Sequence, residues 1–486
     1  MFKKKIVFAT LSSLVLLALL AAPVLAAPGD TTLASANTGG SVGNASSAFP
    51  AISADGRYVA FQSGASDLVA GDAKGMPAIF VRDRGTNTTA LVSVSTGGTQ
   101  GNGGSNQPAI SSTGRYVVFT SSATNLSSVT DNNIAGDIFV RDLVTGTTTL
   151  VSVAPDGTTI GNSGSNDASI TSDGRYVAFE SSASNLVAGD TNGMTDIFVR
   201  DLVSGTTRRV SVDTGGNDAN NISFSAAISA DGRYVAFQSI ATDLVGADAN
   251  GMPDIFVRDL VANTTALVSV DSNEVQAGAG SYGAAISSDG RYVAFASLAT
   301  NLVAGDTNSA VDIFVRDLVA GTTSRVSVAS GGVQANEWSD YPAISPDGRY
   351  VAFPSWASNL VPDDTNGAWD VFVHDTTTGL TVQASVNSSG TEGNGASTRA
   401  DISSNGSTVA FHSQATNMVA GDGNGVTDVF VREPNLNIPI VVFGSGSVPP
   451  TEGANLTTGP SQLLVQFSEN VRSGGVDGSA EYGGNY

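Results

Sequence analysis

One seven-residue motif recurs along the chain at a nearly constant interval, and this repeat restricts the fold more than any other feature. The motif is DGRYVAF or a close variant, and its arginines follow one another at steps of 58, 60, 58, 58 and 58 residues. They are Arg57, Arg115, Arg175, Arg233, Arg291 and Arg349. A degenerate seventh copy has Ser407 at the arginine position. Repeats of this length are typical of solenoids and propellers.

Each repeat contains four short segments rich in β-branched and aromatic residues, and such segments predict strands. In the third copy they are 169–171, 176–179, 197–199 and 209–212. Asp173-Gly174 joins the first two segments, as a tight hairpin requires. Four antiparallel strands per repeat predict a β-propeller blade, although an open solenoid of four-stranded units has the same local pattern.

The number of strands separates these two architectures. The seventh copy, residues 398–433, contains three strand segments but no fourth before Pro434. A matching fourth segment, TTLASAN, occurs at 31–37, before the first copy. A closed ring uses this segment by pairing it with the last blade, whereas an open solenoid does not need it. We therefore predict an all-β, seven-bladed propeller over residues 31–434.

The N-terminus carries the pattern of a secretory signal peptide over residues 1–26. Lys3, Lys4 and Lys5 precede an apolar run at 6–20 and a small-residue cleavage pattern at 24–26. No later apolar run is long enough to span a bilayer. We expect an exported protein, secreted, at the cell surface or periplasmic, without membrane insertion after cleavage. Once the three lysines are removed, the formal net charge of -22 becomes -25, which disfavours nucleic acid as a partner.

The segments ISPDGRYVAF (344–353) and DIFVRDL (196–202) resemble the WD-repeat-like propeller repeats of exported bacterial proteins, including TolB. The resemblance covers roughly 400 residues and implies a propeller that binds partners or shields a catalytic domain. The segment before the propeller in TolB and the hydrolase domain of prolyl oligopeptidase relatives have no counterpart here, so neither a Tol role nor peptidase activity transfers.

The C-terminal residues 435–486 differ in composition from the repeats. The segment VQFSENV (465–471) resembles the opening of a bacterial immunoglobulin-like module. This tail is about half as long as a complete sandwich. We expect an incomplete immunoglobulin-like segment that either continues in a longer gene product or is poorly ordered.

A second motif, D-x-N-G-x-x-D, precedes the third strand of several repeats and predicts calcium binding, because calcium takes six to eight oxygen ligands. The first and twelfth positions of a complete calcium loop are missing, however. The alternative is a hairpin turn in which the second aspartate accepts local hydrogen bonds. The candidate ligands are Asp190, Asn192, Asp196, Asp248, Asn250, Asp254, Asp364, Asn366, Asp370, Asp422, Asn424 and Asp428.

Two further sets of polar residues repeat with the blades. Asn/Ser pairs such as Asn162/Ser165 precede the first strand, and they either satisfy backbone groups or form a polar ring for sugars beside Tyr282, Tyr341 and the three tryptophans. Arginines occupy two repeat positions, which predicts structural ion pairs within or between blades. His374 occupies one of these positions, and we expect it to be structural.

We expect the long loops and linkers to form one face of the ring, which binds a protein or a glycan. The leading prediction is a monomeric, non-enzymatic binding or display scaffold with no catalytic residues and with calcium in several loops. The alternative is a polysaccharide hydrolase or lyase that uses carboxylates on this face, such as Asp340 and Asp363.

Overall fold

The computed structural model describes residues 29–72, 75–133, 135–246 and 248–436. The predicted signal peptide and, from residue 437, the predicted immunoglobulin-like segment lie outside these ranges. Among the described residues, no helix has the length and apolarity needed to cross a membrane.

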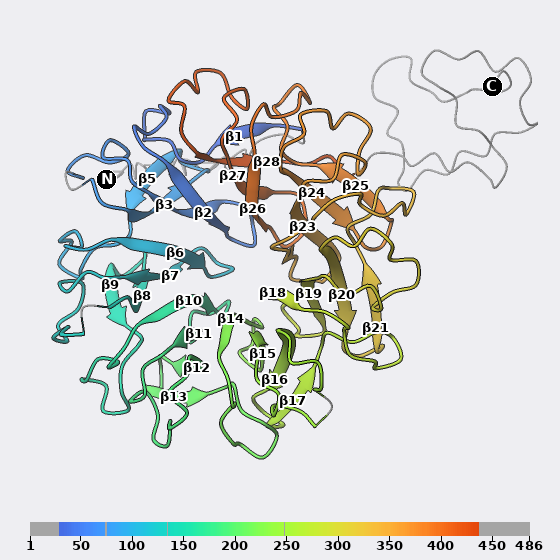
Figure 1. Cartoon of the computed structure of the whole chain (residues 1–486). Coiled ribbons are helices and arrows are strands. Elements are labelled where there is room, and N and C mark those ends of the chain that lie inside the picture. The colour runs from blue at the N-terminus through green and yellow to red at the C-terminus, as the bar shows by residue number, and fades with distance from the viewer. Residues whose placement is uncertain (1–28, 73–74, 134, 247, 437–486) are drawn as a thin grey trace, which may run out of the picture.

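The described chain forms seven four-stranded antiparallel sheets, which confirms the predicted all-β propeller. Each sheet is one blade, and the blades surround a central axis (Figure 1). In chain order the strands are β1 (Thr31–Leu33), β2 (Ser47–Ile52), β3 (Tyr58–Ser63), β4 (Ala78–Asp83), β5 (Thr88–Leu91), β6 (Ser105–Ile110), β7 (Tyr116–Ser121), β8 (Asp137–Asp142), β9 (Thr147–Leu150), β10 (Ser165–Ile170), β11 (Tyr176–Ser181), β12 (Asp196–Asp201), β13 (Thr206–Arg209), β14 (Ser223–Ile228), β15 (Tyr234–Ser239), β16 (Asp254–Asp259), β17 (Thr264–Leu267), β18 (Ser281–Ile286), β19 (Tyr292–Ser297), β20 (Asp312–Asp317), β21 (Thr322–Arg325), β22 (Ala343–Ile344), β23 (Tyr350–Ser355), β24 (Asp370–Asp375), β25 (Leu380–Gln383), β26 (Ser397–Ile402), β27 (Val409–Ser413) and β28 (Asp428–Arg432).

The N-terminal strand closes the ring, as the number of strands predicts. β1 pairs with β28 in the register Thr31↔Arg432, Thr32↔Val431 and Leu33↔Phe430, so the seventh blade has the order β1-β28-β27-β26. A buried ion pair between Arg84 and Glu433, 2.6 Å apart, crosses from the first blade to the seventh. Closure therefore combines backbone pairing with a contact between side chains.

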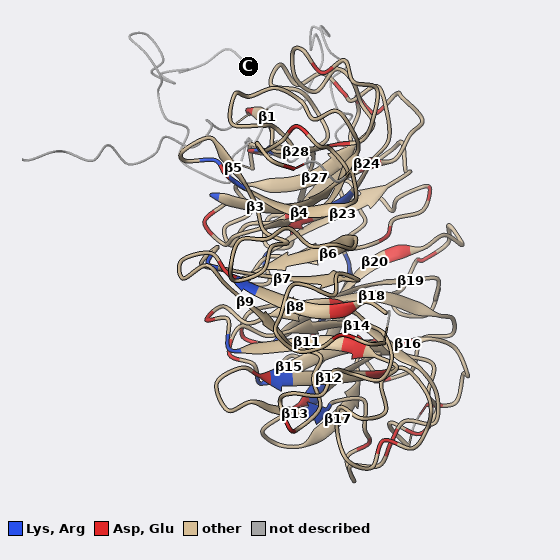
Figure 2. Ribbon diagram, turned by 90° about the vertical axis from the view of Figure 1, so that its left-hand side faces the viewer, with Lys and Arg blue, Asp and Glu red and all other residues tan. Residues whose placement is uncertain are grey.

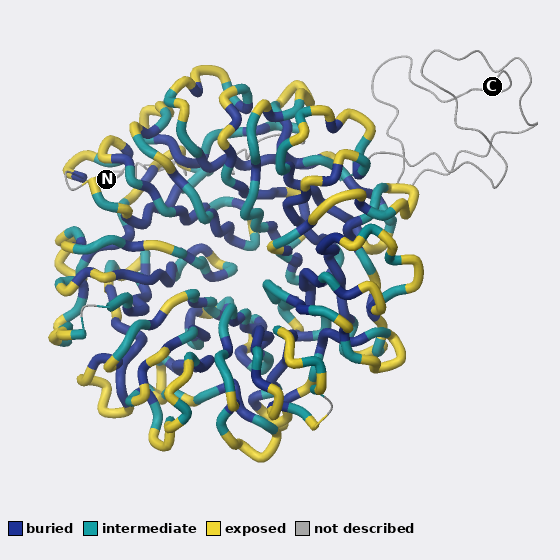
Figure 3. Tube along the Cα trace, in the orientation of Figure 1, coloured by how far each residue is buried: buried dark blue, intermediate teal, exposed yellow. Residues whose placement is uncertain are grey.

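The hydrophobic core lies between adjacent blades. Because side chains alternate along a strand, both faces of each sheet are apolar: Val59 and Phe61 pack against the seventh blade, whereas Ala60 packs against the second. Burial is greatest in the second and third strands of each blade, such as β3 and β4, whereas the outer strands are partly exposed and most exposed residues lie in the peripheral loops (Figure 3). Because all three VAF residues are apolar, this strand contributes to the interfaces with both neighbouring blades.

The GRY part of the repeat links neighbouring blades. The Tyr116 ring lies against the turn glycine of the next blade, Gly174, where a Cβ atom would be 2.2 Å from the ring. The Arg115 guanidinium covers this ring at 4.9 Å and binds both oxygens of Asp142 at 3.0 and 2.7 Å. The first arginine position therefore forms the predicted ion pair within a blade. Most of the Lys and Arg segments of the ribbon lie toward one side of the ring, whereas Asp and Glu segments lie on both sides (Figure 2).

The second arginine position connects blades mainly through neutral acceptors, although Arg316 also forms an ion pair with Glu274 in the preceding linker. Arg141 donates to the carbonyl oxygen of Ser95, in the preceding linker, at 3.1 Å and to Thr148 Oγ1 at 2.9 Å. His374 takes this position in the sixth blade, where it is buried and its Nδ1 lies 2.8 Å from Thr381 Oγ1. Burial lowers the pKa of His374 to about 4, so the ring is neutral at pH 7.

Candidate functional site

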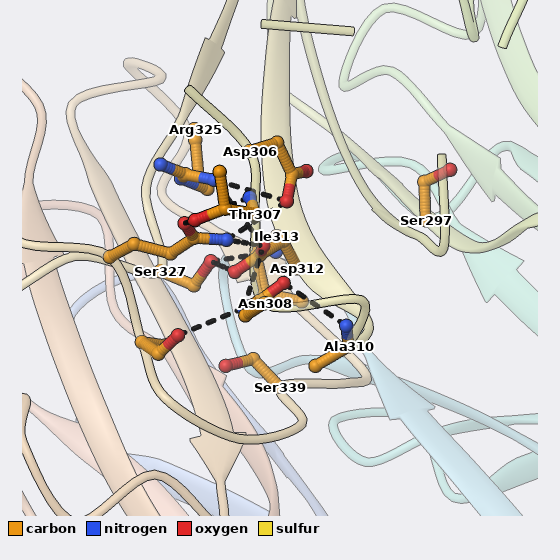
Figure 4. Close-up of polar contacts among 12 residues, drawn as sticks. Ser297, Asp306, Thr307, Asn308, Ala310, Asp312, Ile313, Arg325, Ser327 and Ser339 are labelled. Atoms are coloured by element: carbon orange, nitrogen blue, oxygen red, sulfur yellow. Dashed lines mark hydrogen bonds and ion pairs between the residues drawn. The ribbon is translucent and has the colours of Figure 1, made fainter. Parts of the chain in front are cut away.

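The D-x-N-G-x-x-D loops, and the fifth-blade variant with Ser309 in place of the glycine, fold as hydrogen-bonded turns in front of the third strand. Figure 4 shows the fifth-blade loop, in which Asn308 Nδ2 donates to Asp312 at 3.1 Å and Asn308 Oδ1 accepts from the Ala310 amide at 3.0 Å. Ser327 Oγ donates to the other oxygen of Asp312. Asn192, Asn366 and Asn424 donate in the same way to Asp196, Asp370 and Asp428. The loops therefore bring the predicted asparagine and aspartate together, as the turn interpretation requires.

In three blades a side chain of the protein already lies between the two aspartates of the loop. Arg209 Nη1 lies 3.3 Å from Asp190 and 3.7 Å from Asp196. In the fifth blade the equivalent Arg325 lies 3.5 Å from both Asp306 and Asp312 (Figure 4). In the fourth blade Gln276 Nε2 donates to Asp248 at 2.8 Å and to Asp254 at 2.9 Å. A cation or an amide thus occupies the space between these carboxylates.

The sixth-blade loop differs because its three carboxylates have no arginine among them. Glu392 replaces the amide of Gln276 and Gln334, as Asp218 does in the third blade, but there Arg209 pairs with the carboxylates. Asp364, Asp370 and Glu392 each offer an oxygen within 4.8 Å of the others. Gln383 stands at the position of Arg209 and Arg325 in the strand register, so no arginine lies there. Burial and the nearby charges of Asp370 and Glu392 raise the pKa of Asp364 to about 7. Among the described residues this is the one such group of three metal-ligating side chains.

In the seventh blade the loop holds only two carboxylates. Asp422 and Asp428 are both buried, and burial raises the pKa of each. Leu33 and Val42 occupy the positions of Gln383 and Glu392 in the sixth blade. The twelve predicted ligands therefore do not form four equal sites.

The Asn/Ser pairs of the linkers satisfy backbone and neighbouring side-chain groups. Asn162 Nδ2 donates to Ser184 Oγ at 2.9 Å, and its Oδ1 accepts from the Ser184 amide at 2.9 Å. Ser165 Oγ donates to Ser181 Oγ at 2.9 Å. The same contacts recur in other blades, for example at Asn102 and Asn394. These side chains are structural, in agreement with the backbone interpretation.

A cavity of about 1100 Å³ lies at the centre of the ring, where the first strands of the blades converge. It is bordered by residues of the long loops and linkers, including Thr195, Pro253 and Trp338, so it belongs to the long-loop face. The third residue of every first strand, or of the equivalent segment in the sixth blade, lines it: Phe49, Gln107, Asp167, Ser225, Gly283, Tyr341 and Arg399.

These seven positions share an unusual backbone but not a side chain. All have positive φ, between 45° and 62°, and six of the seven are not glycine. A side chain in this region costs roughly 1–2 kcal/mol. Among the strand positions that the structure describes, this is the only one at which no two blades share a residue. Strained backbone with varied side chains is typical of a binding site.

The cavity contains four charged side chains, on the third, sixth and seventh blades. Asp167, Glu180 and Asp340 contribute carboxyl groups, and burial is the largest cause of the raised pKa of each, which is about 7 for Glu180. Glu180 accepts a hydrogen bond from the Ser225 amide at 3.1 Å. Arg399 is the basic side chain among the described lining residues. Its guanidinium lies 3.6 Å from the Tyr341 ring centroid and 5.4 Å from that of Phe49.

The second histidine, His412, borders this region but is held by the scaffold. Its Nε2 lies 2.6 Å from Thr398 Oγ1, and its Nδ1 accepts from the Phe49 amide at 3.3 Å. Burial lowers the pKa of His412 to about 4. His412 thus occupies in the seventh blade the role that Glu180 has in the third, which is to bind the strained amide of the next blade.

The cavity lies on the long-loop face that the sequence analysis favoured, but most of its lining residues were not among the candidates. Asp340, Tyr282, Tyr341 and Trp338 were identified as candidates, and all four line the cavity. Asp167, Glu180 and Arg399 were not. An available signal was the comparison of equivalent positions across the repeats, in which the third residue of the first strand differs in all seven copies.

Comparison with known proteins does not assign the chain to a family. No protein-family model and no curated protein matches the chain. Similar solved structures include TolB from Acinetobacter baumannii (16% identity, TM-score 0.37, 69% of this chain and 62% of that one). Another is the oligogalacturonate lyase of Vibrio parahaemolyticus (13% identity, TM-score 0.48, 83% of this chain and 91% of that one). A third is the β-propeller domain of the Trilobed protease from Pyrococcus furiosus (12% identity, TM-score 0.49, 80% of this chain and 96% of that one). The chain therefore spans about three fifths of the A. baumannii protein.

Proposed function

We propose that the protein is an exported, non-enzymatic propeller of the TolB-like type that binds a protein or glycan ligand in its central cavity. The single observation that carries this proposal is the varied ring of seven residues with positive φ. Near-identical blades need no such variation for their own packing, since the strand positions that build the interfaces, such as the VAF segment, are almost unchanged between copies. The export part of the proposal is supported by the sequence of residues 1–26.

The test is a binding screen with variants that copy one blade into another. Wild-type protein is screened against glycan and peptide arrays, and the positive ligands are measured again with Tyr341→Ser and Phe49→Ser. Ser225 shows that serine fits this backbone position. We expect roughly tenfold weaker binding, because aromatic contacts of this kind contribute about 1 kcal/mol or more. Unchanged affinity for every ligand would place the site elsewhere.

A polysaccharide-acting enzyme is the second candidate, and the carboxyl groups of the cavity favour it. Glu180, with a pKa of about 7, is suited to act as a general acid or base, and Asp167 lies near enough to raise that pKa further. The test is release of new chain ends from a polysaccharide panel by wild type and by Glu180→Gln. Gln238 shows that glutamine fits this position. Activity that Glu180→Gln abolishes would replace the non-enzymatic proposal.

We further propose that calcium binding, predicted for four loops, is confined to the sixth blade. Three carboxylates converge there without an arginine, whereas Arg209 and Arg325 stand among the carboxylates of the third and fifth blades. Oxygen atoms within 4.8 Å of one another suit the 2.3–2.6 Å bonds of calcium. In the third and fifth blades the arginine already supplies a positive charge to the loop carboxylates, and the seventh-blade loop holds one carboxylate fewer than the sixth.

A further inference from the structure

We propose that the ligand of the central cavity carries a carboxylate that the Arg399 guanidinium binds, and that this carboxylate belongs to an acidic sugar. The inference rests on the proposed function, because it needs the cavity to be the binding site. It adds the chemical class of the ligand and the residue that recognises it.

Arg399 differs from the other described arginines in its contacts. Each of the others donates a hydrogen bond to, or forms an ion pair with, an oxygen atom of the protein. Arg399 forms neither within the described residues, and its contacts are with the rings of Tyr341 and Phe49. A permanently charged group with five unused N–H donors therefore faces the cavity.

The two rings hold this guanidinium in a defined place. Phe49, Tyr341 and Arg399 are equivalent residues of three consecutive blades, and each has positive φ. Packing against a ring occupies a face of the guanidinium plane but leaves its N–H edge open. Such an edge matches the two oxygens of a carboxylate. Since the rings pre-order the donors, little side-chain entropy is lost on binding.

The remaining lining of the cavity favours a sugar acid over an acidic peptide. Asp167, Glu180 and Asp340 offer oxygen acceptors, which sugar hydroxyl groups can satisfy as donors. Burial and the nearby charge of Asp167 raise the pKa of Glu180 to about 7, which reduces the negative charge that a ligand carboxylate meets from this group near pH 7. Trp338 and Tyr341 are 48% and 44% exposed, so their rings are available to the apolar face of a sugar ring. An acidic peptide has few side-chain hydroxyls to use these acceptors.

The test is isothermal titration of the propeller with oligosaccharides of galacturonate, glucuronate and mannuronate, with their methyl esters as uncharged counterparts. Arg399→Gln removes the charge and copies Gln107, which has the same backbone conformation at the equivalent position of the second blade. We expect at least one uronate series to bind, and both Arg399→Gln and esterification to weaken binding by about 10- to 100-fold.

The control variant is Arg208→Ala, which removes a positive charge from an outer strand where Ala90 and Ala266 stand in other blades. It should bind uronates as wild type does. Equal binding of acid and ester, unchanged binding by Arg399→Gln, absence of uronate binding, or binding of acidic peptides in place of uronates would each overturn the inference. The proposed function survives such an outcome if another ligand binds and Tyr341→Ser weakens it, so the two failures are distinguishable.

Discussion

At the scale of single residues, the repeated motif combines a conformational and a steric requirement. The glycine of DGRY has positive φ, and it also lies under the tyrosine of the preceding blade. At Gly290, φ is +73° and a Cβ atom would be 2.1 Å from Tyr234 Cδ2. At Gly305, in the same blade, φ is +77° but no atom lies within 4 Å. Comparing substitutions at these two glycines therefore distinguishes the cost of backbone strain from the cost of a clash between blades.

We predict that Gly290→Ala destabilises the protein clearly more than Gly305→Ala. Both substitutions incur the cost of positive φ, about 1 kcal/mol. Gly290→Ala also forces the Tyr234 ring away from its position, which we expect to add about 1–3 kcal/mol. Urea denaturation of both variants measures the difference. Equal losses of unfolding free energy would mean that the tyrosine can move without cost.

At the scale of elements, the seam between the first and seventh blades departs from the repeat. Thr408 replaces the tyrosine there, and Glu433 replaces the aspartate of the third strand. Glu433 binds Arg84 at 2.6 Å and accepts from Thr408 Oγ1 at 2.8 Å, and the side chains of Arg84 and Glu433 are 7% and 8% exposed. The ion pair of the seam is thus more buried than that of Arg115, whose side chain is 41% exposed.

We predict that Arg84→Met lowers the free energy of unfolding by about 3 kcal/mol, because it leaves the buried Glu433 carboxylate without its cation. Arg115→Met, which breaks a half-exposed pair, should cost about 1 kcal/mol or less from the lost charge interaction. Denaturant titration compares the two. If Arg115→Met proves as harmful as Arg84→Met, then the seam is no more dependent on its ion pair than an ordinary blade.

The sixth-blade loop provides a test of calcium binding by exchange of residues between blades. We predict that calcium raises the melting temperature of wild type, since a ligand that binds only the folded state stabilises it. Glu392→Gln, which copies Gln334 of the fifth blade, should weaken the response. Gln383→Arg, which copies Arg325, should raise the melting temperature without calcium and abolish the response. Calorimetry with calcium and then with a chelator measures both effects, and an unchanged wild-type midpoint at millimolar calcium would contradict the site.

At the scale of the whole molecule, buried carboxyl groups determine how stability depends on pH. The pKa is raised to about 7 at Asp137, Glu180 and Asp364 and to about 6 at Asp401, with burial as the largest cause in each case. In the unfolded chain such groups titrate near 4. Between about pH 4 and pH 7 the folded state therefore binds more protons than the unfolded state, and its stability falls as the pH rises.

We predict a stability maximum at about pH 4, where the two opposing groups of carboxyls exchange dominance. Below about pH 4 the aspartates with lowered pKa values dominate. Arginine partners lower the pKa of Asp142 and Asp201, so the stability that these ion pairs provide is lost as the pH falls. Melting temperatures from pH 3 to pH 8 in calcium-free buffer measure the profile. Asp364→Asn should flatten the slope between pH 5 and pH 7, and a profile that rises steadily to pH 8 would contradict the assignment.

Much of the architecture was predictable, because its causes are local. Strand segments and Asp-Gly turns depend on residues close together in the chain, and the number of strands requires closure by residues 31–37. The side-chain groups were less predictable. Asp190, Arg209 and Asp218 meet only after the second and third strands, the fourth strand and the next linker have packed together. The loop motif alone did not reveal the arginine among its carboxylates.

The amino-acid sequence was sufficient to establish seven blades, their four strands each and the closing strand, since periodicity can be recognised without knowledge of any distant contact. Which residues line the central cavity together is determined by how the blades pack into the ring, and only the tertiary structure shows it. Phe49 and Arg399 are far apart in the chain, and they come together because β1 and β28 close the ring. The positive φ that directs these side chains arises where the first strands bulge, and this geometry depends on pairing and register.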